Sequence, residues 1–170
     1  IAAESGKPLI ECLDEIEWIA SIFEYYSEIG RDQRGRVVAP VTPRSMSMVV
    51  KEAYGVVGCI VPWNYPLLLM AWKAAPALAA GNTVVVKPSE ITPLSIMRWL
   101  EVACDHLPKG IINMVTGFGD TGAFLVEHPD TRVIAFTGSV ETGKKIAAMA
   151  ATQLKKTSLE LGGNDPIIIC

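Results

Sequence analysis

The sequence predicts an α/β fold built on a parallel, doubly wound sheet of the Rossmann-like type. From Gly55 onward, short runs of β-prone apolar residues alternate with segments of helical periodicity. Each crossover between parallel strands places a helix over the sheet, so repeated alternation predicts a sheet covered on both faces. A chain of 170 residues with 50 % hydrophobic and 19 % charged residues is large and apolar enough for one such core.

Residues 10–29 are expected to form an amphipathic helix that ends at Gly30. The apolar positions that recur near the helical period are Leu13, Ile16, Ile19, Phe23 and Tyr26. Residues 36–53 contain Pro40 and Pro43 between β-prone runs, which predicts a short β-hairpin at the edge of the fold or projecting as an arm.

The remaining elements follow in alternation. Pro66 is expected to start a helix that ends at Gly81, and Thr92 with Pro93 to start another. A short helix should run to about His128, and a further helix should cover 141–154. The expected strands are 55–61, 83–86, 111–115, 132–136, 158–161 and the start of one at 166–170. Because the first residues lack a recognisable start and Ile167-Ile-Ile-Cys170 falls within an expected strand, we expect the chain to be truncated at both ends.

Composition excludes several classes of partner. The net charge of −3 and the lack of a Lys/Arg cluster argue against nucleic acid. The longest apolar stretch, 67–80, is interrupted by Lys73 and Pro76 and is too short to cross a bilayer core of about 30 Å, so no membrane partner is expected. His106 and His128 have no ligand-like spacing with cysteine or carboxylate, so no metal is assigned.

The cysteines indicate a reducing compartment, and we expect a cytoplasmic protein. They are far apart, form no C-x-x-C pair and stand among apolar residues, which is typical of small buried hydrophobes. The four positions are Cys12, Cys59, Cys104 and Cys170.

The segment Gly117-Phe-Gly-Asp-Thr-Gly122 matches G-x-G-x-x-G between an expected strand and an expected helix. A dinucleotide fingerprint also needs an acidic residue at the end of the next strand, but that strand ends in Phe136-Thr137. A tight strand-to-helix turn is therefore favoured over a pyrophosphate cradle. A second candidate is Phe136-Thr-Gly-Ser139, where Gly138 allows close approach and Ser139 can cap a helix whose N–H groups would meet a phosphate. A plain N-cap is the alternative.

Charged residues follow the strand at 83–86. Lys87 can donate to ribose hydroxyls and Glu90 can accept from them, a pairing that suits an unphosphorylated adenosine ribose, whereas ordinary surface charge is the alternative.

Two more candidates stand at strand ends. Asn64, in Pro62-Trp-Asn-Tyr-Pro66, could serve as a fixed amide donor toward an oxyanion or be an ordinary turn residue. Glu160, in Leu159-Glu-Leu-Gly-Gly163, would have a raised pKa if buried and could be a general base, or could be a salt-bridged core carboxylate.

Taken together, Pro62-Trp-Asn-Tyr-Pro66, Lys87-Pro-Ser-Glu90, Phe136-Thr-Gly-Ser139 and Glu160-Leu-Gly-Gly163 resemble, in this order, the motifs of the aldehyde dehydrogenase superfamily. The resemblance covers nearly the whole chain and implies a sheet that binds NAD(P) without the usual glycine fingerprint. By this similarity, residues 1–35 are the N-terminal helical part of the coenzyme-binding domain, 36–53 a piece of an oligomerisation arm, and 54–170 the NAD(P)-binding α/β domain.

The resemblance also implies roles for individual residues. Asn64 would help to form an oxyanion hole, and Glu160 would activate the water that hydrolyses a thioester. Lys87 and Glu90 would bind the adenosine ribose, Ser139 the pyrophosphate, and Gly117 the adenine region. The cofactor, NAD with NADP possible, would further contact Ile60, Trp63, Ser89, Phe136, Gly138, Leu161 and Gly162.

The implied activity is oxidation of a small aldehyde to a carboxylic acid through a cysteine thioester. No cysteine matches the family nucleophile, and Cys170 is interpreted as a core residue, so the nucleophile is expected outside this chain. The full-length protein is expected to be a homo-oligomer, and Tyr65 in the Pro-Trp-Asn motif hints at amino aldehydes. The alternatives are a non-catalytic nucleotide-binding module and an acyl-phosphate or CoA-linked reductase of the same superfamily.

Overall fold

A parallel β-sheet forms the centre of the molecule, as the sequence predicts. The computed structural model describes residues 1–164 and 166–169. Within that part, five strands pair in the order β5-β4-β3-β6-β7, and all neighbours are parallel. Their bounds are β3 Val56–Ile60, β4 Thr83–Lys87, β5 Ile112–Met114, β6 Thr131–Gly138 and β7 Lys156–Leu161. The chain runs outward from β3 in one direction and returns to β3's other side, which is the doubly wound arrangement.

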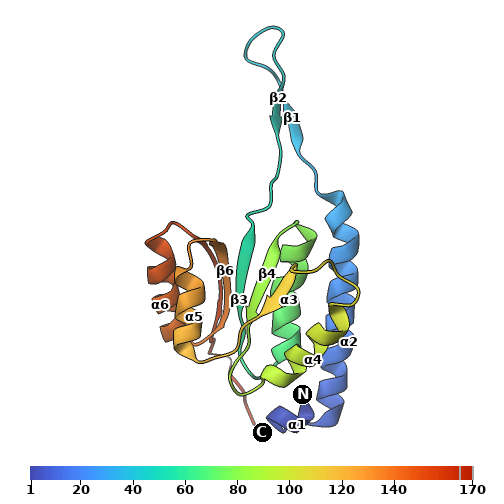
Figure 1. Ribbon diagram of the computed structural model, residues 1–170, viewed down its shortest axis with the longest axis vertical. Helices are drawn as coiled ribbons and strands as arrows, with labels where there is room; N and C mark the ends of the chain where they lie inside the picture. The colour runs from blue at the N-terminus through green and yellow to red at the C-terminus, as the bar shows by residue number, and fades with distance from the viewer. Residues whose placement is uncertain (165, 170) are drawn as a thin grey trace.

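Helices cover both faces of this sheet (Figure 1). On one face lie α2, Leu9–Ile29, α3, Pro66–Ala79, and α4, Pro93–Ala103; on the other lie α5, Gly119–Glu127, and α6, Val140–Ala151. Separate apolar clusters fill the two layers, with Met70, Val86 and Ile96 in the first and Val126 and Ile134 in the second. Both faces of the central strands are therefore buried, which explains their continuous apolar runs.

The hairpin at 36–53 is present and projects from the body (Figure 1). Strands β1, Arg36–Val38, and β2, Ser47–Val49, pair antiparallel, while Pro40 and Pro43 lie in the connecting loop. All residues of both strands are exposed. The end of the molecule opposite to the hairpin carries the N-terminus and, next to Ala2–Ser5 (α1), the start of α2 (Figure 1).

Helix α6 ends at Ala151 rather than at the predicted Leu154, because Leu154 adopts a positive φ of 53° and cannot continue a helix. The turn after it brings Lys155 to the C-terminal end of α5, where its Nζ donates to the carbonyl oxygens of Val126 and His128 at 2.5 and 2.6 Å. A cation at this position satisfies carbonyls that the helix itself leaves without partners.

Two further expectations are wrong. Residues 166–169 form no strand: their apolar side chains are exposed, so no burial stabilises an extended pairing. Cys12 and Cys59 are buried as predicted, but Cys104 is exposed, because it follows the last residue of α4 at the surface. Cys170, predicted to be core, lies outside the described residues. Among the described helices, none is both long and apolar enough to cross a membrane.

Candidate functional site

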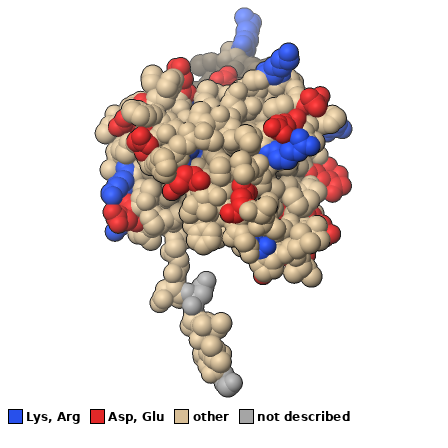
Figure 2. All heavy atoms as spheres, turned by 60° about the horizontal axis from the view of Figure 1, so that its bottom comes forward, with Lys and Arg blue, Asp and Glu red and all other residues tan. Residues whose placement is uncertain are grey.

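The carboxyl ends of the parallel strands gather the predicted site residues along one edge of the sheet. The winding direction reverses between β3 and β6, and open α/β sheets bind ligands in the crevice at such a point. Ile60 ends β3, Lys87 ends β4, Gly138 ends β6 and Leu161 ends β7. Figure 2 views the molecule from this end, and on the visible face basic and acidic side chains are interspersed.

Asn64 and Glu160 line one cavity of about 650 Å³, although they belong to segments far apart in the sequence. Asn64 lies in the turn between β3 and α3, and Glu160 lies near the end of β7. Apolar and aromatic side chains make most of the wall. The other lining residues are Trp18, Ser21, Ile22, Tyr65, Leu68, Leu69, Trp72 and Thr137.

Glu160 is held by two partners on the face covered by α3. Its Oε2 accepts hydrogen bonds from Thr137 Oγ1, the residue opposite it on β6, at 2.7 Å and from Lys73 Nζ at 3.2 Å. Lys73 Nζ also donates to Thr137 Oγ1 at 2.6 Å, and the Lys73 side chain is 6 % exposed. The three side chains thus form a closed triangle, of which Thr137 and Glu160 line the cavity.

Glu160 does not meet the condition of burial under which a raised pKa is expected, and it is ion-paired with Lys73. Its side chain is 49 % exposed, because β7 is an edge strand. Partial desolvation raises the pKa of Glu160, but the hydrogen bond from Thr137 and the charge and hydrogen bond of Lys73 outweigh it. The net pKa lies below the usual range of a glutamate, so this carboxylate is ionised at neutral pH.

Lys87 is buried rather than a surface charge. Its side chain lies at the end of β4, and Nζ donates to the carbonyl oxygen of Pro88 at 2.8 Å. Desolvation lowers the pKa of Lys87, while the nearby carboxylates of Glu90 and Asp120 act in the opposite direction. Glu90 is exposed. A cation with restricted access to water and an exposed carboxylate therefore lie close together at this edge.

The glycine-rich turn at 117–122 also lies next to Lys87 at the end of β4. A Cβ on Gly122 would lie 3.7 Å from Lys87 Cδ and 3.9 Å from Ile60 Cδ1, so α5 begins beside β3 and β4. Gly117 has a φ of +149°, and a Cβ there would meet Thr121 Oγ1 at 2.0 Å. The conformation and the contact both require glycine, which is the role of a tight strand-to-helix turn.

At the end of β6, Ser139 caps α6 by accepting a hydrogen bond from the Thr142 N–H at 3.2 Å. Gly138 lies against the Phe136 ring, whose Cζ would be 2.4 Å from an added Cβ. Close packing within the chain therefore explains Gly138. Ser139 and the first turn of α6 are exposed at the sheet edge.

The other predicted cofactor residues differ in accessibility. Ser89 is buried and accepts a hydrogen bond from the Ile91 N–H at 3.3 Å, whereas Trp63 is 54 % exposed. Leu161 packs against Gly143 of α6, and Gly162 is exposed beyond β7. The predicted set follows the carboxyl ends of β4, β3, β6 and β7 in spatial order, which forms one continuous edge.

None of the three described cysteines lines the cavity shared by Asn64 and Glu160. Burial raises the pKa of Cys59 to about 12, despite the charge of Lys73, which makes it a poor nucleophile. Within residues 1–164 and 166–169, no group of three or more His, Cys, Asp or Glu side chains is placed to hold a metal ion.

Lys73 and Thr137 are site residues that sequence reasoning did not single out. Lys73 is the one charged residue in an otherwise apolar stretch at 67–80, and that isolation is the signal that could have identified it. Thr137 shows no local signal, because its importance comes from its register opposite Glu160.

Comparison with known proteins identifies the family of the chain. The model of the aldehyde dehydrogenase family matches residues 1–170. The chloroplastic betaine aldehyde dehydrogenase of Beta vulgaris is 48 % identical over 98 % of this chain, which spans 34 % of that relative. The structure of betaine aldehyde dehydrogenase from Staphylococcus aureus in complex with NAD⁺ is 41 % identical with a TM-score of 0.91, covering 95 % of this chain and 33 % of that one.

A structure described as an NADP-dependent enzyme of Escherichia coli is also 41 % identical, with a TM-score of 0.92 over 96 % of this chain and 34 % of that one. The chain therefore spans about a third of the length of the relatives it matches. Because the family model extends over every residue of the sequence, the chain belongs to the aldehyde dehydrogenase family.

Proposed function

We propose that a protein containing this chain oxidises an aldehyde to a carboxylic acid with NAD as the hydride acceptor. The observation that carries the proposal is that Asn64 and Glu160 line the same cavity. One supplies an amide donor and the other an ionised carboxylate, which are the groups that hydrolysis of an acyl intermediate needs.

The residues at the sheet edge fit NAD by their chemistry. Lys87 supplies a partly desolvated ammonium donor and Glu90 an exposed carboxylate acceptor, a pair suited to two ribose hydroxyls. The turn at Gly117 and the start of α6 at Ser139 place backbone N–H groups at the same edge of the sheet, where the cofactor would bind. Bound NAD would accept the hydride that leaves the substrate carbon. The carboxylate of Glu90 disfavours a 2′-phosphate by charge repulsion, so we propose NAD as the preferred cofactor over NADP.

The proposed chemistry uses a cysteine thiolate from outside the described residues. Its sulfur bonds to the aldehyde carbon, and the carbonyl oxygen becomes an oxyanion to which the Asn64 amide donates. Loss of hydride then leaves a thioester. Glu160 takes a proton from water as the water oxygen bonds to the acyl carbon, and the C–S bond breaks to release the carboxylic acid and the thiolate.

Lys73 and Thr137 prepare Glu160 for this step. By donating to Oε2, they keep the carboxylate ionised and fix it on the cavity wall. The second oxygen, Oε1, remains for water. An ionised base on the cavity wall favours hydrolysis over transfer of the acyl group to CoA or phosphate.

The cavity favours an amino aldehyde or a quaternary ammonium aldehyde as the substrate class. Trp18, Tyr65 and Trp72 contribute aromatic rings, and indole faces attract organic cations. The name of the Beta vulgaris relative agrees with this class. Tyr65 is also the residue of the Pro-Trp-Asn motif from which amino aldehydes are predicted as substrates.

We also propose that the hairpin formed by β1 and β2 takes part in a homo-oligomer. It projects away from the body and exposes apolar residues on both strands and in its loop (Figure 1). These residues are Val37, Val38, Val41, Met46, Met48 and Val49. A cytoplasmic location stays a prediction that rests on the wide spacing of the four cysteines in the sequence.

The test is the substitution Glu160→Gln in the full-length protein. Glutamine keeps the size of the side chain but cannot accept a proton from water, so deacylation should become rate-limiting. We expect a burst of NADH equal to one turnover per active site, followed by a steady state slowed by about 10²-fold or more. An unchanged steady-state rate would show that Glu160 is not the base.

A further inference from the structure

The turn that carries Asn64 leads into a helix with no cap of its own. The N-cap position of α3 is Tyr65, whose side chain makes no capping hydrogen bond, and the first helical residue is Pro66, which has no N–H. The N–H groups of Leu67 and Leu68 are buried and need an acceptor from elsewhere in the chain.

Glu15 of α2 supplies that acceptor. Its Oε1 accepts hydrogen bonds from Leu67 N–H at 2.9 Å and Leu68 N–H at 3.1 Å, and the residue is fully buried at 0 % exposure. A carboxylate so far from water requires a compensating positive charge. That charge is Lys7, whose Nζ lies 2.9 Å from Glu15 Oε2 and whose side chain is 8 % exposed.

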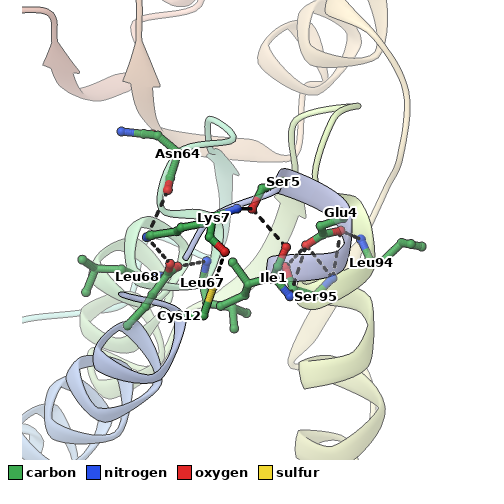
Figure 3. A network of polar contacts seen from close by, with 11 residues as sticks. Ile1, Glu4, Ser5, Lys7, Cys12, Asn64, Leu67, Leu68, Leu94 and Ser95 are labelled. Carbon is green, nitrogen blue, oxygen red and sulfur yellow. Dashed lines mark hydrogen bonds and ion pairs between the residues drawn. The ribbon is translucent and has the colours of Figure 1, made fainter. Parts of the chain in front are cut away.

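Lys7 connects this buried pair to Asn64 (Figure 3). Its Nζ donates to the backbone carbonyl oxygen of Asn64 at 3.3 Å and lies 3.2 Å from the centroid of the Tyr65 ring. The turn is thus fixed on both sides, by Lys7 at the Asn64 carbonyl and by Glu15 at the next helical turn. Neither Lys7 nor Glu15 lines the cavity that Asn64 shares with Glu160.

We propose that Lys7 and Glu15 are positioning residues that set the orientation of the Asn64 amide toward the cavity. This inference rests on the proposed oxyanion role of Asn64. Because oxyanion donors must be fixed before the reaction, and displacement by about 1 Å can cost on the order of 100-fold in rate, a buried clamp on the backbone of the donor residue has a direct kinetic effect.

The chain contains a matched control. Helix α4 also begins with a proline, Pro93, and its N-cap Thr92 makes no side-chain capping bond. Its first turn is capped from a distance by Glu4, which accepts from Leu94 N–H at 2.8 Å and Ser95 N–H at 3.1 Å (Figure 3). Helix α4 carries neither Asn64 nor Glu160. A substitution of Glu4 therefore shows the effect of weakening a distant helix cap without any effect on the Asn64 turn.

The experiment compares Lys7→Met, Glu15→Gln and Glu4→Gln in the full-length protein, with NAD saturating. We expect Lys7→Met to lower the rate of the first hydride transfer by about tenfold or more and the KM for aldehyde to change less than kcat. Glu15→Gln keeps the acceptor for the helix but loses the charge that holds Lys7, so its rate should fall in the same direction. Glu4→Gln removes the same negative charge from a distant cap that does not touch the Asn64 turn, so it should leave this rate unchanged.

A double-mutant cycle with Asn64→Ala separates the clamp from the function of Asn64. If Lys7 acts through Asn64, adding Lys7→Met to Asn64→Ala should change the rate by less than about twofold. An equal loss in both backgrounds, or a folded Lys7→Met protein with wild-type first-turnover rate, overturns the positioning role. A wild-type rate for Asn64→Ala alone instead overturns the oxyanion function. Should Lys7→Met fail to fold, Glu15→Gln takes its place in the same cycle.

Discussion

Lys73 and Glu160 are hydrogen-bonded through Nζ and Oε2 at 3.2 Å, although 87 residues separate them in the sequence. One comes from the helix that follows the Asn64 turn, and the other from the edge strand β7. The contact therefore joins the two segments that carry the proposed catalytic groups. Thr137 completes the contact by bonding to both partners.

Replacing Thr137 by Val should shift the acidic limb of the pH profile for deacylation. The hydroxyl lowers the pKa of Glu160 by donating to it, so its loss raises that pKa and the base becomes protonated at a higher pH. The limb should therefore move to higher pH, while Thr157→Val, on an exposed position of β7, leaves it in place. A limb that stays unmoved in Thr137→Val would mean that this hydroxyl does not tune the base.

Replacing Glu90 by Gln should relax the preference for NAD over NADP. Removal of an exposed charge beside the proposed ribose site is worth roughly 0.2–1 kcal/mol, or about a 1.4- to fivefold change in the ratio of kcat/KM values for the two cofactors. Glu101→Gln removes the same charge from the far end of α4 and should not alter this ratio. If Glu90→Gln changes it no more than Glu101→Gln does, discrimination lies elsewhere.

Replacing Trp72 by Ala should weaken binding of a cationic aldehyde selectively. The indole contributes a face that attracts an ammonium group, worth about 0.5–2 kcal/mol, so KM for betaine aldehyde should rise roughly two- to thirtyfold. The uncharged tert-butyl analogue, with carbon in place of nitrogen, reports the loss of shape alone. Equal increases for both aldehydes would argue against recognition of the charge.

Replacing Lys155 by Met should destabilise the layer formed by α5 and α6. The substitution keeps most of the aliphatic stem but removes the donor to the carbonyls of Val126 and His128. The free energy of unfolding should decrease by roughly 1 kcal/mol in a denaturant titration. Lys144→Met, at an exposed position of α6, tests whether loss of a positive charge alone has this effect.

The sequence was sufficient to predict each strand of the sheet and the helices between them, because these segments carry strong local periodicity. Helix starts at Pro66 and Pro93 were predicted for the same reason: proline and the preceding residue restrict the backbone locally. The exception is residues 166–169, which have the apolar pattern of a strand but are exposed and form none in the structure.

The site was less accessible to sequence reasoning, since its chemistry depends on long-range partners. A local pattern marks Glu160 as unusual, but whether its pKa rises or falls depends on Lys73 and Thr137. Nothing near Glu15 in the sequence indicates that its carboxylate bonds to Leu67 and Leu68, which are 52 and 53 residues away. Asn64 and Glu160 could be proposed individually, whereas their common cavity required the fold.

The two distant caps also bear on how the chain assembles. The first turns of α3 and α4 obtain their acceptors from Glu15 and Glu4, across separations of 52 and 90 residues. Closing such long loops costs conformational entropy before any bond is gained, so we expect these turns to be completed late in folding. During synthesis Glu4 and Glu15 are made before the helices α3 and α4, from whose N–H groups they accept hydrogen bonds. A ribosome-bound chain that stops before residue 66 therefore holds a carboxylate whose partners have not yet been made.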